Sequence, residues 1–265
     1  GSSHPCAALL GCSPRGRWID TARSADAGSG GGCFGAEATV TVLPPHVAGC
    51  GVTSAISAVR AGDLLRTADG STARVVCVVA IVAPAAAPKK LVSLAGGLLI
   101  TPAHPGAPSP HELPPSMAFS HLPWLLITLA HPVHVDGAWR RSGELAGALA
   151  APAATRVYNL VLDRSHMLLV GGHACATWGH GMEGEGIAHA FYGTRRVVDS
   201  LKAMAGWERG AVTVYGVVRG ADGRVCGLID ARGYGQVVAD AEAHGRCGSA
   251  MMLAVPMGHA VRVRV

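Results

Sequence analysis

Cys33 stands at a junction where a cysteine nucleophile could cut the chain. It follows the glycine-rich run 28–32 and comes just before an apolar segment that alternates like a strand. A cysteine that serves only as a core hydrophobe usually lies inside an element. At this junction the thiol could attack the carbonyl carbon of Gly32, whose missing side chain permits close approach. One interpretation is therefore an intramolecular acyl shift at the Gly32–Cys33 bond. The simpler interpretation is an ordinary, partly buried cysteine.

Two copies of a Thr-x-x-His element could assist such a reaction. The first copy contains Thr101 and His104, and the second contains Thr128 and His131. A histidine can protonate a departing backbone nitrogen, and a threonine can hydrogen-bond the scissile peptide or an oxyanion. A structural threonine beside a surface histidine is the simpler explanation of this short pattern. The proline-rich stretch between the copies indicates an insertion near residues 102–128.

A further group of candidates comprises His166, Cys175 and the glycine turn between them. These side chains could support catalysis, or they could simply belong to a hairpin. Zinc sites need four ligands at recognisable spacings, and none of the eight cysteines lies in a Cys-x-x-Cys pair. The Gly-x-Gly-x-x-Gly match at 179–184 lacks the helix start of a dinucleotide site. The sequence therefore predicts no metal and no cofactor, and the scattered cysteines favour a reducing, intracellular compartment.

Short apolar segments separated by glycine-rich turns predict a mostly β fold. Segments 211–218 and 224–230 are expected to pair as one hairpin. The clearest helical periodicity covers 195–205. The strands are expected at 38–43, 64–67, 74–82, 91–101, 156–163, 166–170, 173–178, 211–218, 224–230 and 251–265.

Composition narrows the class of protein. Hydrophobic residues make up 49% of the 265 residues and charged residues only 15%. This composition argues against a coiled coil and against a highly charged disordered chain. The net charge is only +5 and the arginines are scattered, so no nucleic-acid surface is expected. No apolar run reaches the roughly 20 residues of a membrane helix, and the first residues do not resemble a signal peptide.

Taken in order, these pieces resemble the Hint (hedgehog/intein) superfamily of autoprocessing domains. Residues 33–40 resemble the N-terminal splicing block of inteins, and 61–65 resemble a turn in the same block. The Thr-x-x-His copies resemble the second block, and 157–172 resemble a late block. The Vint branch, a Hint-like domain often found with von Willebrand A domains, is the most similar, and 166–194 fit its pattern.

The resemblance implies a fold and a division of the chain. The fold is a mostly β horseshoe with pseudo-twofold halves and one or two short helices. Residues 1–32 form a flexible, extein-like N-terminal segment, 33–181 the Hint core, and 182–265 a C-terminal Vint-type extension.

The resemblance also implies a single-turnover self-cleavage. Cys33 attacks Gly32 and forms a thioester, while a threonine and histidine from the second block activate the amide and protonate its nitrogen. The substrate is the chain's own N-terminal segment, and water, a thiol or another small nucleophile resolves the thioester. Either His104 or His131 could occupy the site, with a slight preference for His131.

The sequence departs from the intein pattern after Gly172, where no His-Asn pair precedes Cys, Ser or Thr. Full splicing with ligation is therefore not expected. Cys175 lies close to where hedgehog proteins carry a cysteine in the late strand. Two alternatives stay open: a catalytically inactive Hint-like binding module, and a cysteine hydrolase that acts in trans. The hydrolase needs a helix after Cys33 to activate the thiol, whereas 34–42 has a strand pattern.

Overall fold

The computed structural model describes residues 17–20, 32–44, 51–95, 124–220, 222–236, 251–255 and 259–264. Its side chains are described for 32–44, 51–94, 125–220 and 222–236. Thr101 and His104, two of the residues expected in the site, lie outside the described residues.

The described chain is mostly strand, as expected, with one eight-residue α-helix and short helical turns. The strands are β1 (Arg17–Asp20), β2 (Phe34–Gly35), β3 (Thr39–Leu43), β4 (Val52–Ala55), β5 (Leu64–Arg66), β6 (Thr72–Val82), β7 (Lys89–Ala95), β8 (Trp124–Thr128), β9 (Pro132–Val135), β10 (Ala138–Arg141), β11 (Leu149–Ala154), β12 (Arg156–Leu162), β13 (Met167–Val170), β14 (His173–Ala176), β15 (Ala211–Val214), β16 (Gly216–Arg219), β17 (Val225–Ile229), β18 (Met251–Val255) and β19 (His259–Arg264). The helical elements are η1 (Ile56–Ala58), η2 (Ser142–Glu144), α2 (Arg195–Lys202) and η3 (Trp207–Arg209), and residues 231–236 are also helical.

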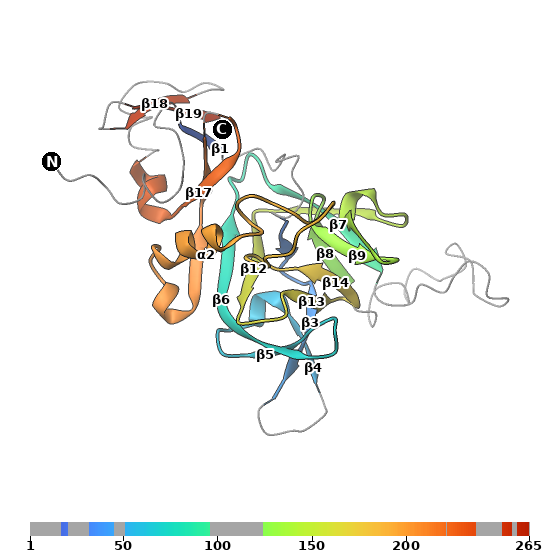
Figure 1. Ribbon diagram of the computed structural model, residues 1–265. Coiled ribbons are helices and arrows are strands. Elements are labelled where there is room, and N and C mark those ends of the chain that lie inside the picture. The colour runs from blue at the N-terminus through green and yellow to red at the C-terminus, as the bar shows by residue number, and fades with distance from the viewer. Residues whose placement is uncertain are drawn as a thin grey trace.

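Most strands join one continuous sheet in the order β10-β9-β14-β13-β3-β5-β6-β12-β2-β8-β7-β11. The long strand β6 runs beside β12 through most of its length (Figure 1). The short strand β2 lies between β12 and β8, far from both in sequence. This arrangement brings residues near 33, 128 and 159 to one place in the sheet.

A second, smaller sheet has the strand order β17-β16-β1-β19-β18. It lies apart from the larger sheet, at the upper left of Figure 1. Strand β1, which belongs to the N-terminal segment, pairs antiparallel with β16 and parallel with β19. The expected C-terminal strand at 251–265 consists of two antiparallel strands, β18 and β19. The N-terminal and C-terminal parts of the chain thus meet in this sheet.

The prediction that 211–218 pairs with 224–230 as one hairpin is wrong for the first part of 211–218. The backbone leaves the larger sheet at Tyr215, so that the run forms two strands. Strand β15 pairs parallel with β6 in the larger sheet, and only β16 pairs with β17. The apolar pattern is the same on both sides of Tyr215, which is why sequence periodicity does not reveal the change of partner.

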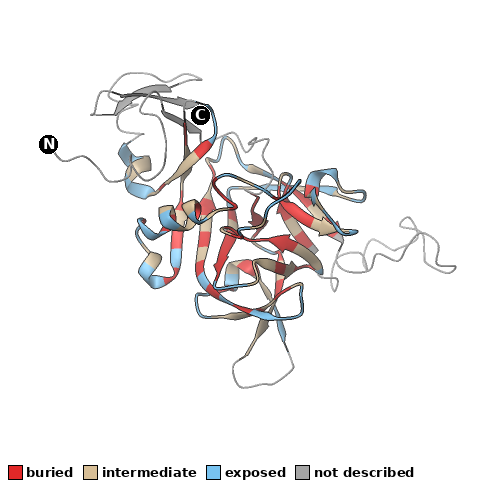
Figure 2. Ribbon diagram, in the orientation of Figure 1, coloured by how far each residue is buried: buried red, intermediate tan, exposed pale blue. Residues whose placement is uncertain are grey.

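Two groups of buried side chains form the core. The first core cluster includes Phe34, Leu65, Leu168 and Cys175. The second core cluster includes Cys33, and helix α2 contributes to it. Strand β6 alternates between exposed and buried positions in its first half, as a half-buried strand does. Buried segments concentrate where the central strands of the larger sheet meet (Figure 2).

Helix α2 begins with a side-chain cap and ends earlier than expected. The hydroxyl of Thr194 accepts a hydrogen bond from the backbone N–H of Arg196 at 3.4 Å. Val197 and Leu201 face the core, as the periodicity predicts. The helix ends at Lys202 rather than near 205, because the chain turns toward Gly206, whose φ is +101°.

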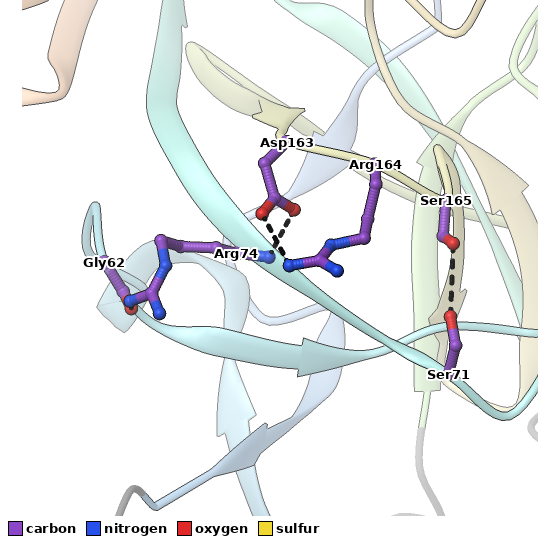
Figure 3. Close-up of polar contacts among 6 residues, drawn as sticks. All are labelled: Gly62, Ser71, Arg74, Asp163, Arg164 and Ser165. Atoms are coloured by element: carbon purple, nitrogen blue, oxygen red, sulfur yellow. Dashed lines mark hydrogen bonds and ion pairs between the residues drawn. The ribbon is translucent and has the colours of Figure 1, made fainter.

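Polar contacts tie the end of β12 to the neighbouring turns (Figure 3). The Asp163 carboxylate accepts a hydrogen bond from the backbone N–H of Arg74 at 2.8 Å and lies 3.2 Å from the Arg164 guanidinium. The hydroxyls of Ser71 and Ser165 are 3.1 Å apart. These contacts are solvent-exposed, so each adds little stability alone, but together they fix where β12 ends.

Candidate functional site

Cys33 comes directly before β2, a strand of two residues that pairs with a neighbour on each side. Phe34 pairs with one residue of β12 and one residue of β8. In both antiparallel ladders, the residue before Phe34 faces the residue that follows its partner. Those residues are Asn159 in β12 and Thr128 at the end of β8. The register therefore gathers three side chains that are far apart in sequence.

Thr128 contacts Cys33 through both its backbone and its side chain. The backbone N–H of Cys33 donates to Thr128 Oγ1 at 2.8 Å. The backbone N–H of Thr128 donates to the Cys33 carbonyl at 2.8 Å. Ser142 Oγ donates to the Thr128 carbonyl at 2.7 Å, which holds the end of β8 in place. Thr128 is buried, so its hydroxyl is committed to the amide nitrogen of the Gly32–Cys33 bond.

His131 lies one turn beyond Thr128 and is fully buried. Its backbone N–H donates to the Thr128 carbonyl at 3.0 Å, so a turn brings the Thr-x-x-His side chains together. Its Nε2 is 2.9 Å from the carbonyl oxygen of Ala176, and its ring centroid is 4.4 Å from that of Phe34. A carbonyl carries no proton, so the ring nitrogen that faces it must be the donor.

Burial lowers the pKa of His131 to about 3, against smaller opposing effects from hydrogen bonds to the backbone of Ala176 and Cys33. The nearby His180 lowers it further. At neutral pH the imidazole of His131 is therefore uncharged and able to accept a proton.

Gly32 packs directly against His131. A Cβ built on Gly32 would lie 2.2 Å from His131 Cα and 2.4 Å from Cγ. These are backbone and ring-root atoms that cannot swing away, so position 32 has no room for a side chain. The absence of a side chain allows the Gly32–Cys33 peptide to lie against the histidine.

Asn159 contacts the other end of the same peptide bond. Its Nδ2 donates to the Gly32 carbonyl oxygen at 2.7 Å. Its Oδ1 accepts the backbone N–H of Leu160 at 2.7 Å and that of Trp178 at 3.0 Å. The residue is fully buried. The carbonyl of Gly32 and the N–H of Cys33 are thus each held by a buried side chain.

The Cys33 thiol is protonated in this state. Burial raises the pKa of the Cys33 thiol to about 12, and the charge of Lys89 opposes the rise. Cys33 packs in the second core cluster together with Cys77 and Trp178. The sulfur is therefore largely removed from solvent in the second core cluster.

Cys175 and His166, also expected in the site, lie in and beside the segment whose Ala176 carbonyl meets His131 Nε2. Cys175 is fully buried in the first core cluster, and burial raises its pKa. His166 is half-buried, and its Nδ1 is 3.3 Å from Thr177 Oγ1. Burial lowers the pKa of His166, and the nearby Asp163 opposes this effect. Neither side chain has a hydrogen bond to the Gly32–Cys33 peptide among the contacts described here, so neither is assigned to the immediate site.

Sequence reasoning missed Asn159 and His180. An asparagine at an inward-facing position of an apolar strand is the signal that could have identified Asn159, because a buried amide needs partners. His180 is buried, its Nδ1 accepts the backbone N–H of Met182 at 2.9 Å, and burial lowers its pKa to about 4. Its sequence context, between two glycines, gave no indication of burial.

The part of the chain that the structure describes contains neither a cluster of metal ligands nor a membrane-spanning helix. In the ranges whose side chains are described, no three His, Cys, Asp or Glu residues gather as metal ligands would. Among the described helices, none is long and apolar enough to cross a membrane.

Comparisons with known proteins found a family match over part of the chain and similar solved structures. The model of the Vint family, described as Hint-domain, matches residues 112–227. No curated protein matches the chain. The solved structure of an MchDnaB-1 intein (N145AA) is 15% identical, with 54% of this chain and 98% of that chain covered and a TM-score of 0.35. A DnaB intein from Synechocystis sp. PCC 6803 is 12% identical, with 55% and 98% covered and a TM-score of 0.33.

Residues 112–227 of this chain are therefore similar to the Vint family of Hint domains. The resemblance drawn from the sequence is confirmed over this range. The matched range contains Thr128, His131 and Asn159, whereas Gly32 and Cys33 lie before it.

Proposed function

We propose that this chain is a self-cleaving Hint domain that breaks its own Gly32–Cys33 bond through a thioester. One observation carries the proposal: Thr128 Oγ1 accepts the N–H of that bond at 2.8 Å while His131 packs against its Gly32 side. A threonine and a histidine therefore both lie beside this one peptide bond, next to a cysteine. An ordinary core cysteine requires no such arrangement.

The proposed first step is an N-to-S acyl shift. Cys33 Sγ attacks the Gly32 carbonyl carbon, the S–C bond forms, and the C–N bond to Cys33 breaks. The thiol loses its proton to solvent and the nitrogen gains one, so that it becomes the amine of Cys33. The upstream segment is then joined to Cys33 by a thioester, and no oxidant or cofactor is consumed.

His131 is proposed to move the proton in this step. The thiol must first lose its proton, because a thiol with a pKa of about 12 is a poor nucleophile. The low pKa of His131 makes the neutral imidazole too weak a base for that step, so solvent takes the thiol proton, and the imidazole takes up a proton only as the tetrahedral intermediate forms. The protonated ring then delivers the proton to the departing nitrogen, whose position Thr128 holds. Thr128 is thus proposed to hold the nitrogen in place, and His131 to deliver the proton to it.

The thioester is proposed to be hydrolysed by water or transferred to a thiol or another small nucleophile. Hydrolysis transfers the hydroxyl of water to Gly32 and restores the Cys33 thiol. Ligation to a downstream segment is not proposed, because the chain lacks a terminal His-Asn pair after Gly172. Cys175 is not assigned as the second nucleophile, because it packs in the first core cluster.

The proposed reaction divides the chain into functional parts. Residues 1–32 are the substrate segment, 33–181 the Hint core, and 182–265 the Vint-type extension. Each molecule reacts once, so the chain is an autocatalyst rather than a multiple-turnover enzyme. A separate hydrolase activity in trans is not proposed, because strand β2 follows Cys33 where a helix N-terminus would have to lie.

The test is intact mass spectrometry of the full chain, incubated with and without dithiothreitol or hydroxylamine. The expected result is cleavage between Gly32 and Cys33 that the added nucleophile accelerates and Cys33→Ala abolishes. Cys77→Ala is the matched control, because Cys77 is also buried in the second core cluster. An uncleaved chain after days with nucleophile would contradict the proposal.

A catalytically inactive Hint-like binding module is the second candidate. The burial that raises the Cys33 pKa to about 12 favours it, because the thiol is enclosed and protonated. This candidate predicts that added nucleophile leaves the mass of the unmodified chain unchanged and that Cys33→Ala alters only local packing.

A further inference from the structure

Asn159 is the only asparagine among the 265 residues, and it contacts the peptide bond that we propose to be cut. Its amide nitrogen lies 2.7 Å from the Gly32 carbonyl oxygen. The two residues are 127 positions apart, so the contact depends on the assembled sheet. The residue is fully buried, and its side chain therefore has fixed partners rather than solvent.

The orientation of the Asn159 amide is set by its other end. Oδ1 accepts two backbone N–H groups, those of Leu160 and Trp178. An amide NH₂ in that place would oppose two donors, so a flip of the side chain would lose three hydrogen bonds. Nδ2 therefore has to face Gly32, and the donor is in position before any reaction begins.

We propose that the Asn159 amide is an oxyanion donor for the acyl shift at Gly32. When Cys33 Sγ attacks, the Gly32 carbonyl oxygen gains negative charge, and a short N–H···O contact to it becomes stronger. The proton stays on Nδ2, and the charge returns to the carbonyl when the C–N bond breaks. This inference rests on the proposed self-cleavage and adds a catalytic residue to it.

A purely structural role would be the alternative. Asn159 could serve only to join β12 to the backbone near Trp178 and to the chain before β2. The two roles require different chemistry. A structural bridge needs the Oδ1 acceptor and a filled volume, whereas the catalytic role needs a proton donor toward Gly32.

Asn159→Asp separates the two roles, because it keeps the shape and the acceptor and loses the donor. An ionised aspartate would repel the developing oxyanion, whereas a protonated one could donate its hydroxyl to Gly32. We therefore expect dithiothreitol-induced cleavage of Asn159→Asp to be about 100-fold slower than that of the unmodified chain at pH 8. The ratio of the two rates should rise toward one as the pH falls. Using the ratio cancels the loss of Cys33 thiolate, which affects both chains.

Ser142→Ala is the matched control, because it also removes a buried hydrogen bond to a backbone carbonyl near Cys33. Its rate ratio to the unmodified chain should be the same at every pH. If the unmodified chain cleaves and the Asn159→Asp ratio is also independent of pH, the oxyanion role is overturned while the proposed function stands. If the unmodified chain does not cleave, both proposals fall.

The single asparagine permits a second measurement that does not need cleavage. In Cys33→Ala protein labelled with ¹⁵N-asparagine, NMR shows one side-chain NH₂ group. The contact predicts that its proton facing Gly32 exchanges slowly with solvent. Rapid exchange of both protons would contradict the contact on which the inference depends.

Discussion

The backbone N–H of Cys33 donates to Thr128 Oγ1, and the backbone N–H of Thr128 donates to the Cys33 carbonyl, both at 2.8 Å. The ladder of β2 with β8 is thus continued beyond the strand by one side chain. A threonine hydroxyl can accept in one state and donate in another by rotating its proton. After the acyl shift, the Cys33 nitrogen is an amine, and the same hydroxyl can donate to it.

Thr128→Val should slow nucleophile-induced cleavage about 10-fold or more, because it keeps the volume and removes the acceptor of the Cys33 N–H. Thr128→Ser retains the hydroxyl and should stay within about threefold of the unmodified chain. Rates can be followed by intact mass after adding dithiothreitol. Equal rates for the valine and serine variants would show that the hydroxyl is not needed.

Gly32→Ala should displace the scissile peptide, because the added Cβ would lie 2.2 Å from His131 Cα. We expect a loss of about 1–3 kcal/mol in the free energy of unfolding, typical of overpacking, and at least 10-fold slower cleavage. Gly235→Ala, where a Cβ meets nothing within 4 Å, is the control, and because position 235 is helical it should raise stability by no more than about 1 kcal/mol. Urea unfolding and cleavage rates measure both effects.

The rate of thiol-induced cleavage should rise with pH from about 6.5 to 9. If sulfur attacks as a thiolate and its pKa is about 12, the thiolate fraction grows about tenfold per pH unit in this range. A plot of log rate against pH should therefore have a slope near one and no plateau. A plateau below pH 8 would mean that a group other than Cys33 limits the rate.

The site was partly predictable from the sequence because its chemistry-bearing residues stand at visible junctions. Cys33 follows a glycine run, and Thr128 and His131 form a short turn after an apolar strand. Asn159 was not predictable as a site residue, because its role depends on the pairing of β2 with β12. A two-residue strand has no periodicity to reveal such pairing. The partner switch at Tyr215 was missed for a similar reason, since one apolar run serves two sheets.

Acid should destabilise the protein through His131. Its pKa is lowered from 6.5 in the unfolded chain to about 3 in the folded one, so below about pH 6.5 the unfolded state binds the extra proton. The stability from its neutral form is complete above about pH 6.5 and falls progressively toward pH 3. His180, with a pKa lowered to about 4, contributes in the same direction.

His131→Gln should therefore make the free energy of unfolding less dependent on pH between 4 and 7. His134→Gln, on β9 outside the site, serves as the control and should keep the pH dependence of the unmodified chain. Urea titrations at several pH values measure the slopes. A steep slope that persists in His131→Gln would assign the acid sensitivity to other groups.

Residues 96–123 should be dispensable for the fold and for cleavage. They connect β7 to β8, which pair antiparallel up to Ala95 opposite Trp124. An Asn-Gly turn can join residues so placed. We expect the shortened chain to keep its melting temperature within a few degrees and its cleavage rate within about threefold. Because the deletion removes Thr101 and His104, loss of cleavage with an intact fold would assign the reaction to the first Thr-x-x-His copy.

The distance in sequence between Gly32 and its partner on β12 sets the order of events during synthesis. The contact spans 127 positions, and the amide that makes it is oriented by Trp178, further toward the C-terminus. A growing chain therefore has no complete site until residue 178 has left the ribosome and the long-range pairing has formed, which is the slow part of folding a β protein. Release of the upstream segment would thus report that the core behind it has folded, and a chain that misfolds would keep its two parts covalently joined.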